Sequence, residues 1–476
     1  MGLIPKAAFA SGAVGAAIAY LAVVRYLYSV SEVHTLSAAQ VGVACFYGCV
    51  LSLWLGAEVG FLVARRQPEY ESIAAASTDD ELELVAEDDK DSDPPQKPAK
   101  TAEPTIFSMP ASVLPLLRLA AEFVLIMGYI YLADRTVLIA KGPKLQTKLG
   151  FWLLNLAILA AGVCSMRGGE NEVATGGSGG GAIEAPVKPL QRDQTEEWKG
   201  WMQIMFVLYH YFAEAEIYNA IRMYIAAYVW MTGFGNFSYY YVRKDFTAVR
   251  FVQMMWRLNF FVFFVCITMN NEYMLYYICP MHTFFTWGVF VPLYIRHDLN
   301  DSFKVLGVKI ALTLAGALAL YDLPGVFNAL MSPLSGLLAF HDPLHPENAP
   351  MHEWFFRSGL DHLVWVFGML CALSFPFWER KLQEMEELEP ARRQVVKSTV
   401  LGATLVAVAA WYWQFFSLPK RSYNRVHPFT SFIPIFLYLV LRNITAGLRR
   451  RHMHMFAWCG KITLETYILQ VRRDHG

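Results

Sequence analysis

Long apolar stretches separated by short polar segments occupy most of this chain. A helix needs about 20 predominantly apolar residues to cross the hydrocarbon core of a bilayer. The expected spans lie near residues 8–28, 41–64, 112–133, 149–166, 200–220, 221–241, 251–270, 273–295, 305–320, 324–340, 358–378, 398–417, 428–446 and 454–470. The pattern predicts an all-α fold, a polytopic transmembrane helical bundle of about 12–14 spans. Residues 200–241 also fit one long bent helix with a re-entrant piece.

Two polar breaks divide the N-terminal part from the rest. Residues 67–111 are acidic and nearly free of large apolar side chains, so we expect them to be disordered. Residues 167–195 are rich in Gly and predict a flexible linker. The predicted organisation is a two-span region at 1–66, the acidic loop, a second two-span region at 112–166, the linker, a multi-span domain at 196–470 and an atypical end at 471–476 that suggests truncation.

Composition agrees with a membrane protein. Of the 476 residues, 55% are hydrophobic and 17% are charged, whereas soluble domains carry about 25% charged residues. The 40 basic residues balance 40 acidic ones and are scattered, so we expect the lipid bilayer as a partner and no nucleic acid. Pro343 interrupts the helical spacing between His341 and His345, and we predict no metal site and no bound cofactor.

Residues 201–230 form an apolar segment that carries an unusual number of polar groups. A charged side chain near the bilayer centre costs about 2.5–3.5 kcal/mol, so such groups usually face a cavity or a partner and have a function. Side chains four residues apart share one face of a helix. On one continuous helix, the stripe comprises His210, Glu214, Tyr218 and Arg222, and a second face holds Glu216 and Asn219.

The stripe suggests acid–base chemistry. A carboxylate one turn from a histidine orients the ring and stabilises the imidazolium, so His210 and Glu214 are the catalytic candidates. Arg222 would hold a phosphate, a carboxylate or Glu216. Glu216, Asn219 and Arg222 are therefore candidates for binding substrate or donor. The alternative is that these groups form interhelical salt bridges that lock the bundle.

Two further segments add candidates for donor binding. Glu353, Arg357 and Asp361 repeat every four residues, which predicts an ion-paired start of a helix. The functional alternative is that Arg357, Asp361 and His362 reach a cavity from its rim. His282 follows Pro280, which we expect to kink its span, and breaks of this kind often line sites.

Four motifs resemble a known family. They read EEWKGWMQIMFVLYHYFAEAEIYNAIRMY, QMMWRLNFF, YMLYYICPMHTFF and HEWFFRSGLDH. From about Glu196 to Gln470, the chain resembles the multi-span acyltransferase domain of the plant Reduced Wall Acetylation proteins. The animal sialic-acid O-acetyltransferase and the fungal capsule O-acetylation proteins share this domain. Those relatives also carry a luminal domain with a serine-hydrolase-like site, and the four spans expected here instead resemble the plant type.

The resemblance implies a multi-pass Golgi membrane protein that takes part in O-acetylating glycans such as cell-wall polysaccharides. It implies acetyl-CoA as a cytosolic donor, and a glycan acceptor or separate luminal acetyltransferases as partners. The string YHYFAEAEIYNAIR carries a site role over to His210, Glu214, Glu216, Asn219 and Arg222, and the strings SGLDH and CPMH add Asp361 and His282. His210 would act as base or transient acetyl acceptor. The alternative functions are a transporter of acetyl-CoA or another donor into the Golgi lumen, and a scaffold for luminal transferases.

Overall fold

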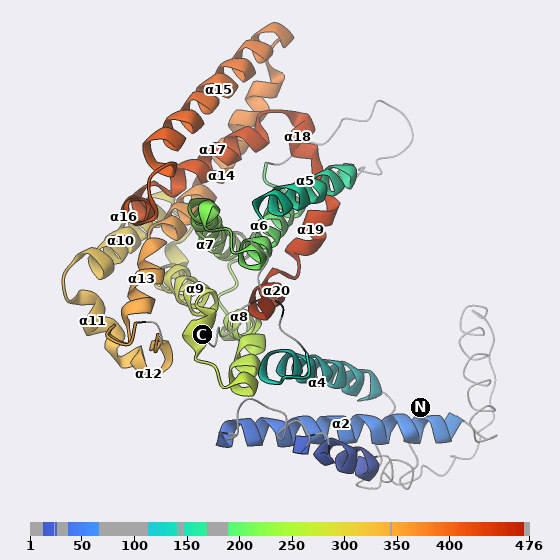
Figure 1. The fold of residues 1–476 in the computed structure, drawn as a ribbon. Helices are drawn as coiled ribbons and strands as arrows, with labels where there is room; N and C mark the ends of the chain where they lie inside the picture. The colour runs from blue at the N-terminus through green and yellow to red at the C-terminus, as the bar shows by residue number, and fades with distance from the viewer. Residues whose placement is uncertain are drawn as a thin grey trace, which may run out of the picture. The chain divides into compact units, whose positions relative to one another are not determined.

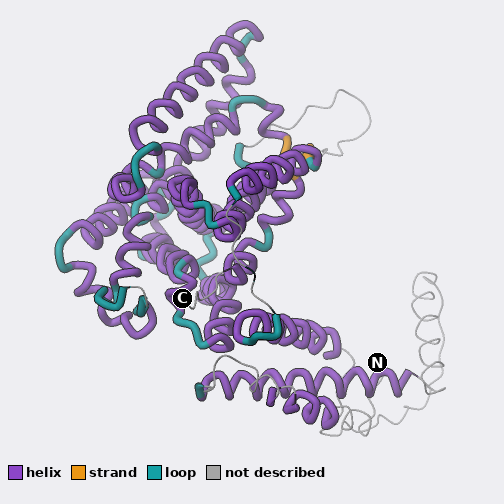
Figure 2. The backbone as a smooth tube through the Cα atoms, in the orientation of Figure 1, coloured by secondary structure: helices purple, strands orange, loops and turns teal. Residues whose placement is uncertain are grey.

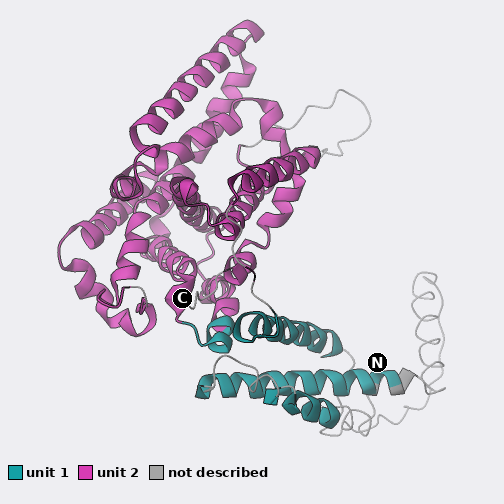
Figure 3. Cartoon of the chain, in the orientation of Figure 1, with its two compact units in different colours: residues 1–141, 264–271 teal, residues 142–263, 272–476 magenta. Residues whose placement is uncertain are grey.

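Helices make up nearly all of the described backbone, and the predicted all-α class is confirmed (Figure 2). The computed structural model describes residues 13–22, 24–25, 37–65, 113–139, 142, 147–168, 189–342 and 345–470. The acidic stretch predicted to be disordered, the central part of the predicted linker and the end at 471–476 lie outside these residues. Two compact units share the described chain: residues 1–141 with 264–271, and residues 142–263 with 272–476 (Figure 3).

The first unit is built on α2 (Ala38–Arg65), α4 (Leu114–Arg135) and the last residues of α8 (Ala248–Met269). Ala57 and Leu114 are buried where α2 packs against α4. Arg118 donates from Nε to Oε1 of Glu58 at 2.5 Å, which links the same two helices. Such a pairing suits long apolar helices because it satisfies their few charges within the unit.

The second unit holds most of the chain (Figure 1). Its elements are α5 (Lys148–Cys164), β1 (Met166–Gly168), α6 (Arg192–Phe212), η2 (Ala215–Ile217), α7 (Tyr218–Arg243), most of α8, η3 (Tyr273–Tyr276), α9 (Ile278–Tyr294), η4 (His297–Leu299), α10 (Phe303–Asp322), α11 (Val326–Met331), η5 (Ser332–Leu334), α12 (Ser335–Leu338), α13 (His352–Leu360), α14 (Val364–Glu387), α15 (Pro390–Trp411), η6 (Tyr412–Phe416), α16 (Lys420–Thr430), α17 (Phe432–Asn443), α18 (Ala446–Arg450), β2 (Arg451–Met453), α19 (His454–Gly460) and α20 (Thr463–Gln470). The strands β1 and β2 pair antiparallel. Helix α7 packs against α9 and α14, and this packing forms the main core of the unit.

Pairs of glycines allow helices of the second unit to cross at backbone contact. A Cβ on Gly233 of α7 would lie 1.9 Å from the carbonyl oxygen of Trp365 on α14, and Gly368 of α14 faces α7 with a similar clash. A second pair, Gly200 and Gly460, lies where α6 packs against α19. Because lipid gives helices no hydrophobic reason to associate, close van der Waals packing over small residues supplies much of the attraction.

We expect Gly233→Ala to destabilise the protein and Gly235→Ala to leave it unchanged or slightly more stable. A Cβ at 233 overlaps a carbonyl oxygen, and overpacking of this kind costs about 1–3 kcal/mol. A Cβ at 235 on the same helix meets nothing within 4 Å, and Ala is favoured over Gly in a helix by about 0.5–1 kcal/mol. Thermal unfolding of the two purified variants measures the difference, and equal midpoints would contradict the crossing.

Six helices among the described residues are long and apolar enough to cross a membrane. They are Ala38–Val59, Leu114–Arg135, Ala248–Met269, Phe303–Asp322, His352–Glu387 and Pro390–Phe416. Each overlaps a span expected from the sequence, which confirms a multi-pass membrane protein. The total of about 12–14 spans stays a prediction.

Three local predictions are wrong. The stretch 324–340 is not one helix but the short pieces α11, η5 and α12, with Pro333 in the first turn of η5. The stretch 454–470 is divided into α19 and α20. Pro280 lies in the first turn of α9, where no intrahelical bond needs its missing N–H, so the kink expected there does not form.

Candidate active site

The segment 201–230 is not one helix, so the predicted continuous stripe is wrong. Helix α6 ends at Phe212 because Ala213 adopts the left-handed conformation with φ 50°, which cannot continue a right-handed helix. A new helix, α7, begins only at Tyr218. His210 has an exposed side chain in the last turn of α6, whereas Glu214 is buried ahead of η2. The catalytic roles of His210 and Glu214 stay predictions from the sequence.

Glu216 and Asn219 make contacts different from those expected. Glu216 is exposed and forms an ion pair with Lys148 at the start of α5, so it does not pair with Arg222. Asn219 donates from Nδ2 to the carbonyl oxygens of Phe416, at 2.8 Å, and Leu418, at 2.9 Å. These carbonyls lie at the end of η6, a π-helical turn, and just before α16. Asn219 therefore positions the start of α16, and its role in binding substrate stays a prediction.

Arg222 is the central residue of the segment. Its side chain is only 1% exposed, and its Nε donates to the hydroxyl of Tyr218 at 3.1 Å. The two terminal nitrogens, Nη1 and Nη2, are buried and have no hydrogen-bond partner among the described residues. Burying donors without a partner costs about 1–3 kcal/mol, and more for a charged group. A protein that keeps such a group usually has a use for it at a functional site.

Two more cations lie around the same aromatic rings. The guanidinium of Arg222 lies 5.7 Å from the ring centre of Phe356, and that of Arg357 lies at the same distance from this ring. Lys420 lies over the ring of Tyr218 at 4.6 Å. Aromatic faces attract cations, so the rings hold these groups in place without neutralising their charge.

The ion-paired helix start predicted at 353–361 is confirmed only for its first pair. Arg357 donates from Nε to Oε2 of Glu353 at 3.0 Å. Helix α13 ends at Leu360, so Asp361 leaves the helical register and turns towards α16.

Asp361 instead pairs with a histidine that the sequence reasoning missed. The side chains of Asp361 and His427 are fully buried, with 3.4 Å between Oδ1 and Nε2. The other ring nitrogen, Nδ1, lies 3.2 Å from the hydroxyl of Tyr423. Oδ2 of Asp361 has no partner among the described residues. The carboxylate fixes the proton on Nε2, which leaves Nδ1 as the acceptor.

One sequence signal could have revealed His427. The segment 420–430 is strongly polar between two apolar stretches, and Tyr423 and His427 are four residues apart. The regular spacing places both on one face of α16. The sequence analysis placed candidates in residues 201–230, beside Pro280 and at 353–361, and passed over this shorter segment.

These groups form one cluster, which we call the polar centre. It comprises Tyr218, Arg222, Arg357, Asp361, Lys420, Tyr423 and His427. The charge of Arg222 acts on the hydroxyl of Tyr423, and the charge of Asp361 acts on the ring of His282. His282 also hydrogen-bonds Thr232 of α7, with Nδ1 and Oγ1 2.6 Å apart. Four elements of the second unit, α7, α9, α13 and α16, thus converge here.

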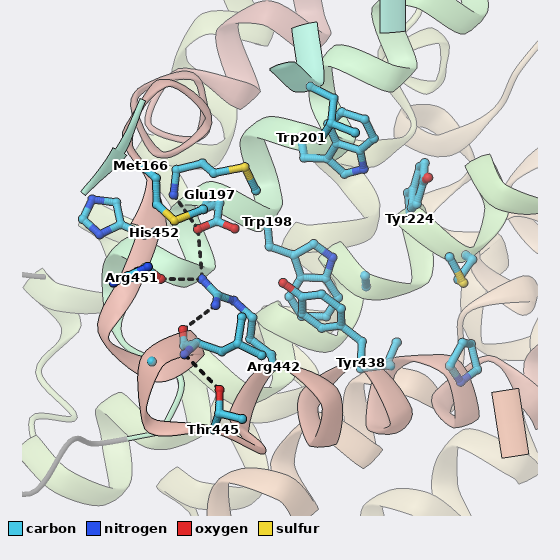
Figure 4. Close-up of a pocket in the computed structure, with 18 residues that line it drawn as sticks. Met166, Glu197, Trp198, Trp201, Tyr224, Tyr438, Arg442, Thr445, Arg451 and His452 are labelled. Atoms are coloured by element: carbon cyan, nitrogen blue, oxygen red, sulfur yellow. Dashed lines mark hydrogen bonds and ion pairs between the residues drawn. The ribbon is translucent and has the colours of Figure 1, made fainter. Parts of the chain in front are cut away.

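A cavity of about 760 Å³ lies on another face of α7 (Figure 4). Met223, Tyr224 and Ala227 line it. Each helical residue turns by about 100°, so these three side chains leave α7 on the side roughly opposite Arg222. The cavity and the polar centre are therefore two separate sites of the second unit.

Comparison with known proteins identifies the family. Residues 31–472 match the family described as "10 TM Acyl Transferase domain found in Cas1p". This chain belongs to the Cas1p acyltransferase family. The zebrafish (Danio rerio) protein named N-acetylneuraminate (7)9-O-acetyltransferase is 31% identical over 365 residues, which make up 73% of this chain and 43% of the relative. The Cas1p-type chain thus matches less than half of that relative's length. No solved structure matches it.

Proposed function

We propose that this Cas1p-type chain is a membrane O-acetyltransferase and that the polar centre is its reaction centre. One observation carries the site: the buried guanidinium of Arg222 has two terminal nitrogens without a partner in the described part of the chain, in the same cluster as the pair formed by Asp361 and His427. An acyl transfer needs a base for the acceptor hydroxyl and a donor for the oxyanion that develops on the carbonyl. The polar centre offers one candidate for each role.

His427 is the proposed base. With its Nε2 proton held by Asp361, Nδ1 can take the proton of an acceptor hydroxyl. In this structure Nδ1 faces the hydroxyl of Tyr423. In the reaction, the hydroxyl of the acceptor would take the place of the Tyr423 hydroxyl beside Nδ1. The acceptor oxygen bonds to the acetyl carbon, the carbon–sulfur bond of a thioester breaks, and His427 returns the proton to the leaving thiolate. Asp361 stabilises the imidazolium between the two transfers.

Arg222 is the proposed oxyanion donor. Its terminal N–H groups are buried and have no partner among the described residues, so they need little reorganisation when charge develops on the carbonyl oxygen. Lys420 adds positive charge over the ring of Tyr218, which favours an anionic donor, and Arg357 lies over the ring of Phe356 while paired with Glu353. We propose acetyl-CoA as this donor, with Arg357 close to its phosphates.

The proposed acceptor is a sugar hydroxyl of a glycan in the Golgi lumen. The printed name of the zebrafish relative specifies acetylation of N-acetylneuraminate, which is a sugar acid. The motif resemblance to proteins of wall and capsule acetylation supports polysaccharides of the Golgi as the wider class. Separate luminal acetyltransferases are the proposed partners if the chain hands acetyl on to them.

Separate labels on the acetyl group and on the CoA distinguish transfer from transport. We expect sealed vesicles that contain the full chain and a glycan acceptor to accumulate acetyl label in the lumen while the CoA label stays outside. Vesicles without the chain are the control. Luminal accumulation of both labels in equal amounts would show a transporter and contradict the proposal.

A further inference from the structure

The cavity beside α7 has a charged rim and an apolar interior. Figure 4 shows Glu197, Arg442, Arg451 and His452 on one side and the rings of Trp201 and Tyr224 on the other. Its volume of about 760 Å³ is that of a site for a molecule of several hundred daltons. None of these groups belongs to the polar centre, so we consider a separate ligand for the cavity.

The rim is held in place by a buried ion pair. Arg442 lies 3.1 Å from Oε2 of Glu197, measured from Nη2, and the same nitrogen donates to the carbonyl oxygen of Arg451 at 2.6 Å. Glu197 also accepts from the backbone N–H of Met453 at 2.9 Å. These bonds fix β2 at the mouth, and they pair Arg442 with Glu197.

Arg451 remains as the group of the rim that a ligand can use. Arg451 is exposed, and its side chain forms no ion pair within the described part of the chain. His452 follows it on β2, is only 8% exposed and points to the opposite face of the strand. The paired N–H donors of a guanidinium match the spacing of two phosphate oxygens. The rim therefore suits one phosphate group.

The interior suits a hydrocarbon body. Trp198 and Tyr438 pack ring against ring at 4.4 Å, and Met223 and Ile435 complete the apolar wall. A nucleotide has polar groups along its whole length, and most of them would lose their hydrogen bonds here, which costs free energy for each group. An alkyl chain has no hydrogen bonds to lose, and burial of its apolar surface lowers the free energy.

We propose that this cavity binds a membrane phospholipid, with the phosphate at Arg451 and an acyl chain against the apolar wall. The charged rim binds the phosphate end of such a molecule, and the apolar wall binds its hydrocarbon end. The site is independent of acetyl transfer, because it lies on another face of α7 from Arg222.

Binding of two matched lipids to the purified full chain tests the proposal. Native mass spectrometry would compare dioleoyl phosphatidic acid with dioleoylglycerol, which has the same chains and no phosphate. We expect the phosphatidic acid to bind at least tenfold more tightly. Arg451→Gln should remove about tenfold of its affinity and leave dioleoylglycerol unaffected, since only the phosphate contact is lost. Met223→Trp should fill the cavity and weaken both lipids.

Arg392→Gln is the matched control, because Arg392 is exposed on α15 and does not line the cavity. It should bind both lipids like the unchanged chain. Equal affinity for the two lipids, or equal behaviour of Arg451→Gln and Arg392→Gln, would overturn the proposal. Binding of CoA that depends on Arg451, without binding of phosphatidic acid, would overturn it in favour of a nucleotide. Since Arg451 is exposed, its variant tests the site even if Met223→Trp fails to fold.

Discussion

His427→Ala is expected to lower the rate of acetyl transfer by about 10²- to 10⁴-fold, the usual contribution of a positioned general base. The ring nitrogen Nδ1 is the proposed proton acceptor, and no other histidine lies in the polar centre as defined by its contacts among the described residues. Single-turnover transfer from acetyl-CoA to a glycan acceptor in reconstituted vesicles measures the effect. His352→Ala, an exposed change at the start of α13, is the control and should retain the full rate.

Loss of the ring also leaves Asp361 buried without its partner, so the alanine variant will be less stable. Asp361→Asn keeps the shape of the pair and removes only its charge, and it should lower the rate by about 10²-fold or more with less effect on folding. His210→Ala separates the two catalytic hypotheses. We expect it to retain activity, because His210 has an exposed side chain in the last turn of α6. Full activity of His427→Ala, together with loss in His210→Ala, would contradict the proposed base.

Arg222→Met should lower the transfer rate by about 10²- to 10³-fold, which is the loss measured when one oxyanion donor is removed. The same change should leave the thermal unfolding midpoint unchanged or raise it. Nη1 and Nη2 have no hydrogen-bond partner, and the charge has no carboxylate partner, among the described residues, so relief of their burial offsets the loss of the hydrogen bond from Nε to Tyr218. Lower activity with equal or higher stability is typical of a group kept for function.

Two further variants complete the Arg222 test. Arg222→Lys keeps the positive charge and loses the fork of donors, so it should recover only part of the rate. Arg243→Met changes an exposed arginine at the end of the same helix and should alter neither activity nor stability. A large loss of stability in Arg222→Met without a loss of transfer would show that Arg222 is structural.

The sequence predicted the long helices well because their evidence is local. Each of the six long apolar helices among the described residues overlaps an expected span. Length and apolarity alone define such a helix. The segments that failed, such as 324–340 and 454–470, are apolar too, but they are divided by turns that depend on packing and on single residues such as Pro333.

The candidate site was predicted in part. Arg222, Arg357, Asp361 and His282 are in or beside the polar centre, as the cost of burying charged groups suggested. The error concerned their partners. The left-handed Ala213 ended the helix that would have joined His210 to Arg222, and helical spacing cannot anticipate a break of this kind without a Gly or Pro signal.

The sequence by itself determined the class of the fold, the family and the presence of costly polar groups inside apolar segments. These depend on composition, on local spacing and on contiguous motifs. Only the tertiary structure decided that Asp361 pairs with His427, that Asn219 holds the turn before α16 and that two nitrogens of Arg222 have no partner among the residues it describes. The residues of these contacts lie 66 positions apart for the pair, and 197 and 199 apart for the turn. Local sequence patterns cannot predict contacts between residues so far apart along the chain, because packing between helices brings these groups together.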